Sequence, residues 1–286
     1  MSALTIRHRT SYRYHKPVRL GPHRLMLRPR ESREVRLVSS SLEITPEASA
    51  SWTNDVFGNA VATVSFANPT DHLLIDSITV VELAASPWPV FDIAASAIRY
   101  PFSYSSDDAT DLGPLAIPQY FDSDGRLTDW ASAFVRGTET DTLALLKDLV
   151  AGAAGQIRYQ SREEEGTQSP RQTLERGWGS CRDFAVLFAE AARSLGFGAR
   201  IISGYLYNPD HLPLQNGAGS THAWAEIYLP GPGWITFDPT NRAVGGFNLI
   251  PVAVGRSIGQ VMPVTGSFFG MTDAYHDLSV EVQVSP

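Results

Sequence analysis

The sequence predicts an α+β protein in which a strand-rich N-terminal part precedes a mixed core of helices and strands. Three observations lead to this prediction. Apolar and polar side chains alternate from residue 4 to residue 14, and helical spacing begins near residue 127. A strongly amphipathic helix pattern at 184–195 is then followed by two alternating runs at 221–238. A period of two is typical of half-buried strands, and a period of 3.6 is typical of amphipathic helices.

The composition is that of a folded chain with a sizeable core. Of the 286 residues, 43% are hydrophobic, and 30 acidic against 23 basic side chains give a net charge of −7. This acidic balance argues against nucleic acid as a partner, because nucleic-acid binding needs a basic surface. The sequence has no apolar run of about 18 residues and no apolar signal segment near its start. We therefore expect a cytoplasmic protein without a membrane partner.

Cys181 is the only cysteine of the chain. A single thiol excludes an internal disulfide and any zinc or iron–sulfur site built from several thiolates. None of the seven histidines is followed by another at helical i, i+4 spacing. The sequence also lacks the glycine-rich fingerprints of phosphate and dinucleotide sites. We expect neither a metal nor a cofactor.

The first 95 residues predict an antiparallel β-sandwich-like domain. One face of the first expected strand carries Leu4, Ile6, His8, Tyr12 and Tyr14. Similar short runs predict further strands at residues 35–38, 42–44, 60–66 and 78–83. Turn residues separate these runs, and several short strands at this spacing favour a sandwich.

A change in composition marks the end of this domain. Residues 96–126 are rich in Pro, Ser, Asp and Gly and show no sustained periodicity. This stretch predicts a connector to a core domain at 127–286. Within the core, the acidic triplet Glu163-Glu164-Glu165 is expected to lie in a solvated loop.

Helical spacing predicts the first helices of the core. One is expected at 127–134 and another at 143–153, because their apolar residues recur on one face. Thr138 and Asp141 have the spacing of a capping box before the second of these helices. Ser169-Pro170 predicts the start of a third, since proline is favoured in the first helical turn.

The stretch around the cysteine predicts the start of a buried helix. Its apolar stripe is Phe184, Leu187, Phe188, Ala191, Ala192 and Leu195, and Gly196 ends the pattern. Ser180 and Asp183 have capping-box spacing, which makes Cys181 the first helical residue and explains Asp183 without a catalytic role. The positive end of the helix dipole favours a thiolate at this position. The alternative is a small buried cysteine that only fills the core.

Two alternating runs downstream, joined by Pro-Gly-Pro-Gly, predict a β-hairpin between residues 221 and 238. If Tyr228 pairs with Trp234, His222 and Asp238 become diagonal neighbours on one face, within reach of a hydrogen bond. The carboxylate then fixes the imidazole tautomer and stabilises its cation. Together with a thiol, such a pair forms an activated nucleophile. Taken singly, His222 also fits a structural strand histidine and Asp238 fits a turn opening.

Several linked motifs carry a resemblance to a known family. The core contains Gly177-Trp-Gly-Ser-Cys181-Arg-Asp-Phe-Ala, Ala-Arg200-Ile-Ile-Ser-Gly204-Tyr205, His222-Ala-Trp224-Ala-Glu226-Ile-Tyr and Gly233-Trp-Ile-Thr-Phe-Asp238-Pro-Thr-Asn. The front half contains His8-x-Thr10-x-Tyr12-x-Tyr14, Leu20-Gly21-Pro22-His23, Leu27-Arg28-Pro29-Arg30 and Asp55-Val-Phe-Gly58-Asn59. Over nearly the whole chain these motifs resemble the bacterial transglutaminase-like proteins, including their N-terminal region.

The resemblance implies a papain-like, transglutaminase-like core in which the cysteine helix packs against an antiparallel sheet. It implies that Cys181 is the nucleophile, His222 the acid and base, and Asp238 the orienting carboxylate. The alternating run at 278–284 is expected to add a late strand to the same sheet.

Other residues near these motifs are candidates for the oxyanion site and the cleft. The backbone N–H of Cys181 is the expected oxyanion donor, because it lies at a helix start. Trp178 is a candidate for the second donor, or else a packed wall. Trp224 and Glu226 share the face of His222, so that they either line the cleft or are outward strand residues.

The roles assigned by the resemblance predict thiol-dependent hydrolysis of an amide bond in a peptide or protein, through an acyl-thioester intermediate. The alternative is acyl transfer to an amine with the same three residues, because a fold alone does not select the acceptor. A third hypothesis is a non-catalytic protein that binds a peptide or another partner. The substrate and the oligomeric state stay open at this point.

Overall fold

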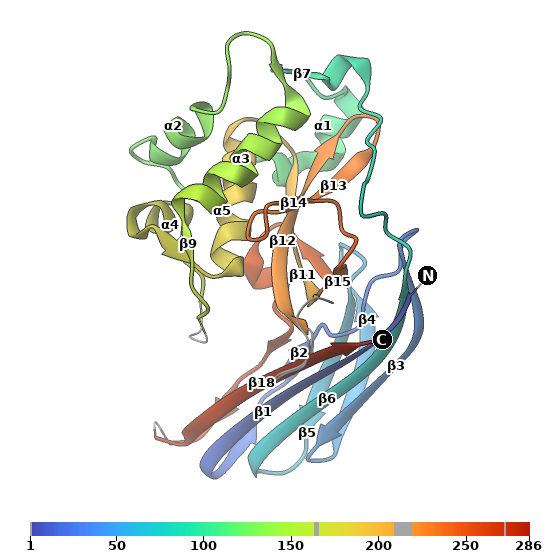
Figure 1. Cartoon of the computed structure of the whole chain (residues 1–286). Coiled ribbons are helices and arrows are strands. Elements are labelled where there is room, and N and C mark those ends of the chain that lie inside the picture. Colours follow the sequence, from blue (N-terminus) through green and yellow to red (C-terminus); the bar gives the residue numbers. More distant parts are fainter. Residues whose placement is uncertain (1, 163–165, 209–218, 272) are drawn as a thin grey trace.

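The computed structural model describes residues 2–162, 166–208, 219–271 and 273–286. It confirms the predicted α+β class: a β-sandwich lies beside a core in which helices cover an antiparallel sheet (Figure 1). The acidic triplet at 163–165, predicted as a solvated loop, lies outside the described residues.

Two antiparallel sheets form the sandwich. The first has the order β17-β1-β6-β3, and β18 also pairs with β1. Its strands are β1 (Ser2–Leu20), β3 (Val35–Thr45), β6 (Thr70–Leu83), β17 (Phe268–Phe269) and β18 (Tyr275–Ser285). The second has the order β16-β2-β5-β4, with β2 (His23–Leu25), β4 (Ala48–Asn54), β5 (Ala60–Phe66) and β16 (Val264–Thr265). The predicted alternation in β1 is confirmed, because Leu4 and Ile6 are buried and Arg7 is exposed.

The sequence located these strands with some errors in their bounds. The two strands predicted at 35–38 and 42–44 are one strand, β3, whose register shifts between Leu37 and Ser39. This β-bulge offsets the alternation and makes one strand look like two. The strands β2 and β4 escaped prediction, since β2 has three residues and β4 has no buried apolar face.

The expectation that the run at 278–284 joins the core sheet is wrong. These residues belong to β18, which pairs with β1, so that Val284 lies opposite Ile6 and Val282 opposite His8. Alternation predicts a half-buried strand but does not name its neighbour. The sandwich therefore contains strands from both ends of the chain, which lie side by side in Figure 1.

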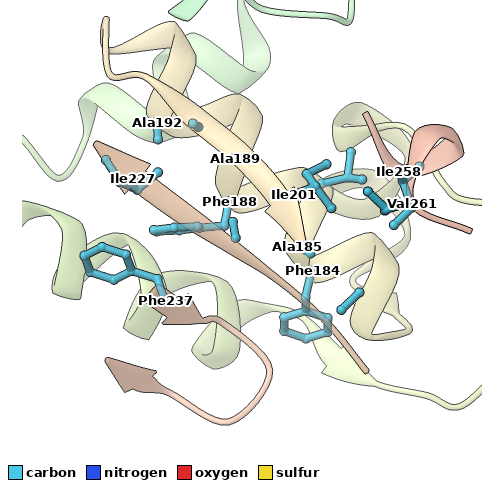
Figure 2. Close-up of a cluster of buried hydrophobic side chains, with 14 of the residues drawn as sticks. Phe184, Ala185, Phe188, Ala189, Ala192, Ile201, Ile227, Phe237, Ile258 and Val261 are labelled. Atoms are coloured by element: carbon cyan, nitrogen blue, oxygen red, sulfur yellow. The ribbon is translucent and has the colours of Figure 1, made fainter. Parts of the chain in front are cut away.

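The core sheet has the order β14-β13-β12-β11-β15. Its strands are β11 (Ala199–Tyr207), β12 (Gly219–Leu229), β13 (Gly233–Asp238), β14 (Ala243–Val244) and β15 (Leu249–Gly255). The helices are α2 (Arg126–Ser132), α3 (Thr142–Gln156), α4 (Pro170–Arg176) and α5 (Cys181–Ser194). Helix α5 lies between the sheet and the other three helices, and its apolar residues pack against Ile201, Ile227 and Phe237 (Figure 2).

Short elements complete the fold. The stretch predicted as a connector holds the 3-10 turns η1 (Ala95–Ala97) and η2 (Gly113–Ala116), the strand β7 (Arg99–Tyr100) and the helix α1 (Ser106–Leu112). Three more pairs of residues extend as β8 (Thr140–Asp141), β9 (Arg158–Tyr159) and β10 (Trp178–Gly179), and η3 (Ile258–Gln260) follows the core sheet. Tyr100 stacks on Phe197, so this part of the chain lies against the core.

The helix ends follow their capping residues. Asp141, not Thr138, caps α3: its side chain accepts a hydrogen bond from the N–H of Ala144 at 2.8 Å. Ser169 caps α4 as predicted. In the part of the chain that the structure describes, no helix has both the length and the apolar character needed to cross a membrane.

A buried histidine joins the sandwich to the core. Nδ1 of His8, in β1, lies 3.0 Å from the hydroxyl of Tyr205, in β11, and Nε2 lies 3.1 Å from the hydroxyl of Thr10. His8 is 2% exposed, and burial lowers its pKa from 6.5 to about 4. The folded protein thus holds this imidazole in its neutral form.

We expect this contact to weaken in acid. Since the pKa of His8 is depressed in the folded state, the unfolded chain binds the proton first, and stability present above pH 6.5 is lost as the pH falls toward about 4. The expected loss is about 3 kcal/mol in the free energy of unfolding. Urea unfolding of the wild type and of His8→Gln at both ends of this range measures it. Carboxylates titrate alike in both proteins, so an equal acid loss in both would contradict the prediction.

Candidate active site

The start of α5 places the cysteine as the sequence predicts. Cys181 is the first residue of the helix and is partly exposed. The carboxylate of Asp183 accepts hydrogen bonds from the N–H of Ser180 at 2.8 Å and from its hydroxyl at 2.9 Å. These bonds fix the turn that leads into the helix. The thiol therefore lies at the positive end of the helix dipole, which stabilises a negative charge there.

Asp183 is a structural residue of this turn. It is fully buried, and it also accepts from the N–H of Gln168 at 2.6 Å and from the guanidinium of Arg162 at 3.1 Å. A buried carboxylate needs such partners. This supports the interpretation of Asp183 as a capping residue.

The hairpin of β12 and β13 brings a histidine and an aspartate together. Tyr228 pairs with Trp234, the register on which the prediction depended. Nε2 of His222 lies 2.8 Å from Oδ2 of Asp238, and both side chains are at least 94% buried. The predicted diagonal contact is confirmed.

The same histidine forms a hydrogen bond with the thiol of Cys181, so that Cys181, His222 and Asp238 form one group. Burial by itself lowers the pKa of His222, but hydrogen bonds to Asp238 and Cys181 outweigh it and raise the pKa to about 10. Burial by itself raises the pKa of Asp238, but the hydrogen bond and charge of His222 and the hydrogen bonds from Asn241 together outweigh it, so that this pKa lies below its usual value. A cationic imidazole beside an ionised carboxylate is the charge state that these contacts favour.

Asn241 is a site residue that the sequence analysis missed. Its side-chain amide donates to Oδ2 of Asp238 at 2.7 Å and lies 3.4 Å from Nε2 of His222. Its backbone N–H donates to Oδ1 of Asp238 at 3.2 Å, and the N–H of Thr240 donates to the same oxygen at 3.0 Å. The sequence signal was Asp-Pro-Thr-Asn, in which an aspartate that opens a turn accepts from residues two and three positions later. Asn241 thus holds the carboxylate in the orientation that faces His222.

The remaining candidates have different surroundings. Trp224 is 1% exposed and does not line an open surface: its ring stacks on that of His222, with centroids 6.1 Å apart. Glu226 forms an ion pair with Arg200 at 2.6 Å. Trp178 is half-buried, with the guanidinium of Arg176 5.7 Å from its ring centre, which fits a packed wall. Its role as an oxyanion donor stays a prediction.

Comparisons with known proteins agree with this architecture. Residues 4–82 match the sequence model described as the bacterial transglutaminase-like N-terminal region. Residues 100–239 match the model of the transglutaminase-like superfamily, and this segment contains all three residues of the candidate site.

Relatives extend the likeness over the full chain. The uncharacterized protein ML0607 of Mycobacterium leprae is 26% identical over 291 residues, which cover 99% of both chains. The crystal structure of a candidate cysteine protease from Cytophaga hutchinsonii is 18% identical and has a TM-score of 0.69, and the match covers 99% of this chain and 91% of that one. The uncharacterized protein YebA of Bacillus subtilis is 34% identical over 75 residues, 23% of this chain and 10% of YebA.

The two sequence models cover the sandwich and the core in turn, and the structural likeness joins both parts in one chain of the same fold. The chain therefore belongs to the transglutaminase-like superfamily and carries a bacterial transglutaminase-like N-terminal region before its core.

Proposed function

We propose that this protein hydrolyses an amide bond of a peptide or protein substrate, with Cys181 as the nucleophile. The observation that carries the proposal is the contact of one imidazole with both the thiol and a buried carboxylate, which keeps the pKa of His222 near 10. Such an imidazolium stabilises a thiolate next to it and can donate its proton later in the reaction. Membership of a superfamily of cysteine-based enzymes supports the same conclusion.

In the first half of the reaction, the thiolate of Cys181 attacks the carbonyl carbon and a C–S bond forms. The negative charge moves to the carbonyl oxygen, where the backbone N–H at the start of α5 stabilises it. His222 then gives its proton to the leaving nitrogen. The C–N bond breaks, an amine leaves, and a thioester remains on the sulfur.

In the second half, His222 is neutral and accepts a proton from water as the water oxygen attacks the thioester. The C–S bond breaks, the carboxylic acid leaves, and the proton taken by His222 restores the imidazolium beside the thiolate. Asp238 stabilises the imidazolium in both halves and stays ionised. Asn241 keeps Asp238 in place through its amide contact.

An activated ester tests this sequence of steps, because it acylates the thiol without a specific substrate. Intact mass spectrometry after mixing with 4-nitrophenyl acetate is expected to show one acetyl group on the wild type and none on Cys181→Ala. The acetyl group is expected to leave as acetate and to restore the unmodified protein. A wild type that gains no acetyl group and releases 4-nitrophenol no faster than Cys181→Ala would contradict the proposal.

Adding a primary amine at millimolar concentration to the same reaction shows whether water or the amine accepts the acyl group from the thioester. We propose water as the acceptor because it is abundant and needs no dedicated site. Acetate is then the main product at every amine concentration. Formation of the N-alkyl acetamide in proportion to the amine would instead identify an acyltransferase. Acylation that is never released in water would support a binding protein with an inactive site.

A further inference from the structure

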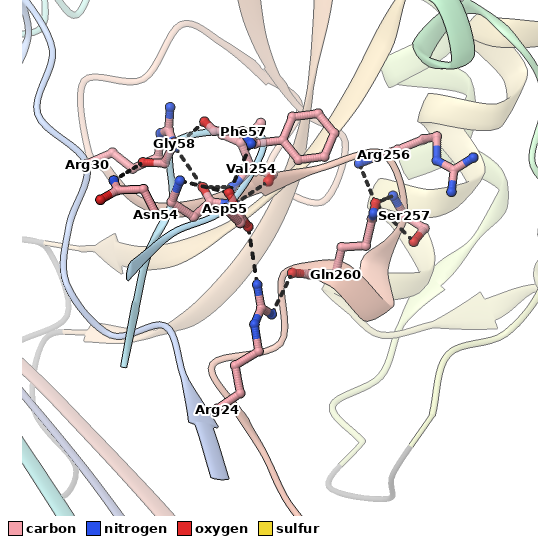
Figure 3. Close-up of polar contacts among 11 residues, drawn as sticks. Arg24, Arg30, Asn54, Asp55, Phe57, Gly58, Val254, Arg256, Ser257 and Gln260 are labelled. Atoms are coloured by element: carbon pink, nitrogen blue, oxygen red, sulfur yellow. Dashed lines mark hydrogen bonds and ion pairs between the residues drawn. The ribbon is translucent and has the colours of Figure 1, made fainter. Parts of the chain in front are cut away.

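A loop of the sandwich reaches the core close to the catalytic hairpin. Residues 55–59 form a turn closed by Asp55, whose Oδ1 accepts from the N–H groups of Phe57 and Asn59, both at 3.0 Å (Figure 3). Its other oxygen accepts from Arg24 at 3.2 Å. The loop is therefore held in one conformation by its own aspartate.

Asn59 fastens this loop to the core sheet. It is fully buried, and its amide donates to the carbonyl of Val254 at 2.7 Å and accepts from the N–H of Val254 at 2.9 Å. The guanidinium of Arg30 donates to the side-chain oxygen of Asn59 at 2.7 Å and to the carbonyl of Phe57 at 3.0 Å (Figure 3). The side-chain amide of Asn59 thus makes the two hydrogen bonds to β15 that the backbone of a neighbouring strand would make.

This attachment places Phe57 against a small apolar cluster inside the core. The cluster consists of Ile202, Trp224, Leu249 and Val254, and Phe57 packs on it from the sandwich side. Within this cluster, Trp224 also stacks on His222, with an angle of 29° between the rings. The cluster therefore connects Phe57 to His222 through Trp224.

Packing is what fixes the ring of Trp224. Its indole N–H is buried and makes no hydrogen bond to any residue that the structure describes. Gly204 closes one end of the ring, since a Cβ at this glycine would lie 2.8 Å from Cη2 of Trp224. The remaining support comes from the cluster that Phe57 covers.

We propose that the loop at 55–59 positions the catalytic imidazole: Phe57 holds Trp224, and Trp224 sets the plane of His222 relative to Cys181. One side chain of the N-terminal region, Phe57, thereby supports the orientation of the catalytic imidazole. This inference rests on the proposed function of the same site. It predicts that a change made in the sandwich alters the reactivity of the thiol.

The test is the rate of Cys181 alkylation by iodoacetamide against pH, followed by intact mass. Phe57→Ala removes the ring, and we expect labelling near pH 6 to fall about tenfold, the equivalent of a shift of about one pH unit in the acid limb. Phe57→Leu keeps much of the apolar volume and is expected to restore most of the rate. Val56→Ala is the matched control, because Val56 is the next residue of the loop and is 94% exposed.

The melting temperature of each variant separates positioning from stability. A lower melting temperature of Phe57→Ala with an unchanged labelling profile would overturn the inference, as would an equal change in Val56→Ala. If Phe57→Ala does not fold, Phe57→Val, which removes the ring but keeps a small apolar side chain, decides by the same two measurements, and slower labelling than in Phe57→Leu is expected. Equal labelling of Cys181 in the wild type and in His222→Ala would instead contradict the proposed function. The two failures are therefore distinguishable.

Discussion

Replacing His222 by alanine is expected to slow alkylation of Cys181 near pH 6 by up to about 300-fold, the ratio between a fully ionised thiol and an ordinary one. Free cysteine titrates near pH 8.5, so an ordinary thiol is only roughly 0.3% ionised at that pH. The thiolate is the reacting species. In the wild type, the imidazolium next to the sulfur and the start of α5 both favour the thiolate. The variant lacks the imidazolium, and its labelling rises only as the solution becomes alkaline.

The single cysteine makes this measurement direct, because Cys181 is the only thiol of the chain and Cys181→Ala gives the background from other groups. His72→Ala, in strand β6 of the sandwich, controls for the loss of a histidine in general. Equal labelling of wild type and His222→Ala at every pH would contradict the ion pair. The raised pKa of His222 also gives the upper limit: the imidazolium, and with it the protonation of the leaving amine, is expected to be lost as the pH rises through about 10.

The parts of the site that the sequence predicted depend on short-range patterns. Helical spacing and the Ser180–Asp183 pair set the start of α5. The turn between β12 and β13 fixes the register of the two strands, and this register places His222 within hydrogen-bond distance of Asp238. A local sequence pattern thus predicted a contact wherever all of its residues belong to one hairpin or one helix turn.

The parts that escaped prediction depend on contacts between distant segments. β18 pairs with β1 across nearly the whole chain, and Asn59 bonds to Val254 from 195 positions away. The local sequence around each of these residues does not indicate its distant partner. A strand or an asparagine with a different partner would have the same local pattern. The burial of Trp224 has the same origin, because its neighbours come from the sandwich as well as the core.

A second large effect is expected away from the site, where Arg193→Met should lower the free energy of unfolding by about 3–5 kcal/mol. Arg193 and Glu190 form an ion pair on α5, and both side chains are at most 1% exposed. The substitution leaves the carboxylate of Glu190 buried without its cation. Urea unfolding at neutral pH measures the change. Arg171→Met is the matched control: its pair with Glu175 is exposed, and little or no change is expected.

The loss has a second cause besides the unpaired charge. Arg193 donates to the carbonyls of Leu115, Ala199 and Arg256, while Glu190 accepts from the N–H groups of Gln119 and Tyr120. The pair therefore satisfies backbone groups from three other segments, and each such group costs about 1–3 kcal/mol when it is left buried and unsatisfied. A double variant with methionine at both positions removes both charges but leaves these groups unpaired. It is expected to stay less stable than the wild type, whereas recovery of wild-type stability would show that the charges alone matter.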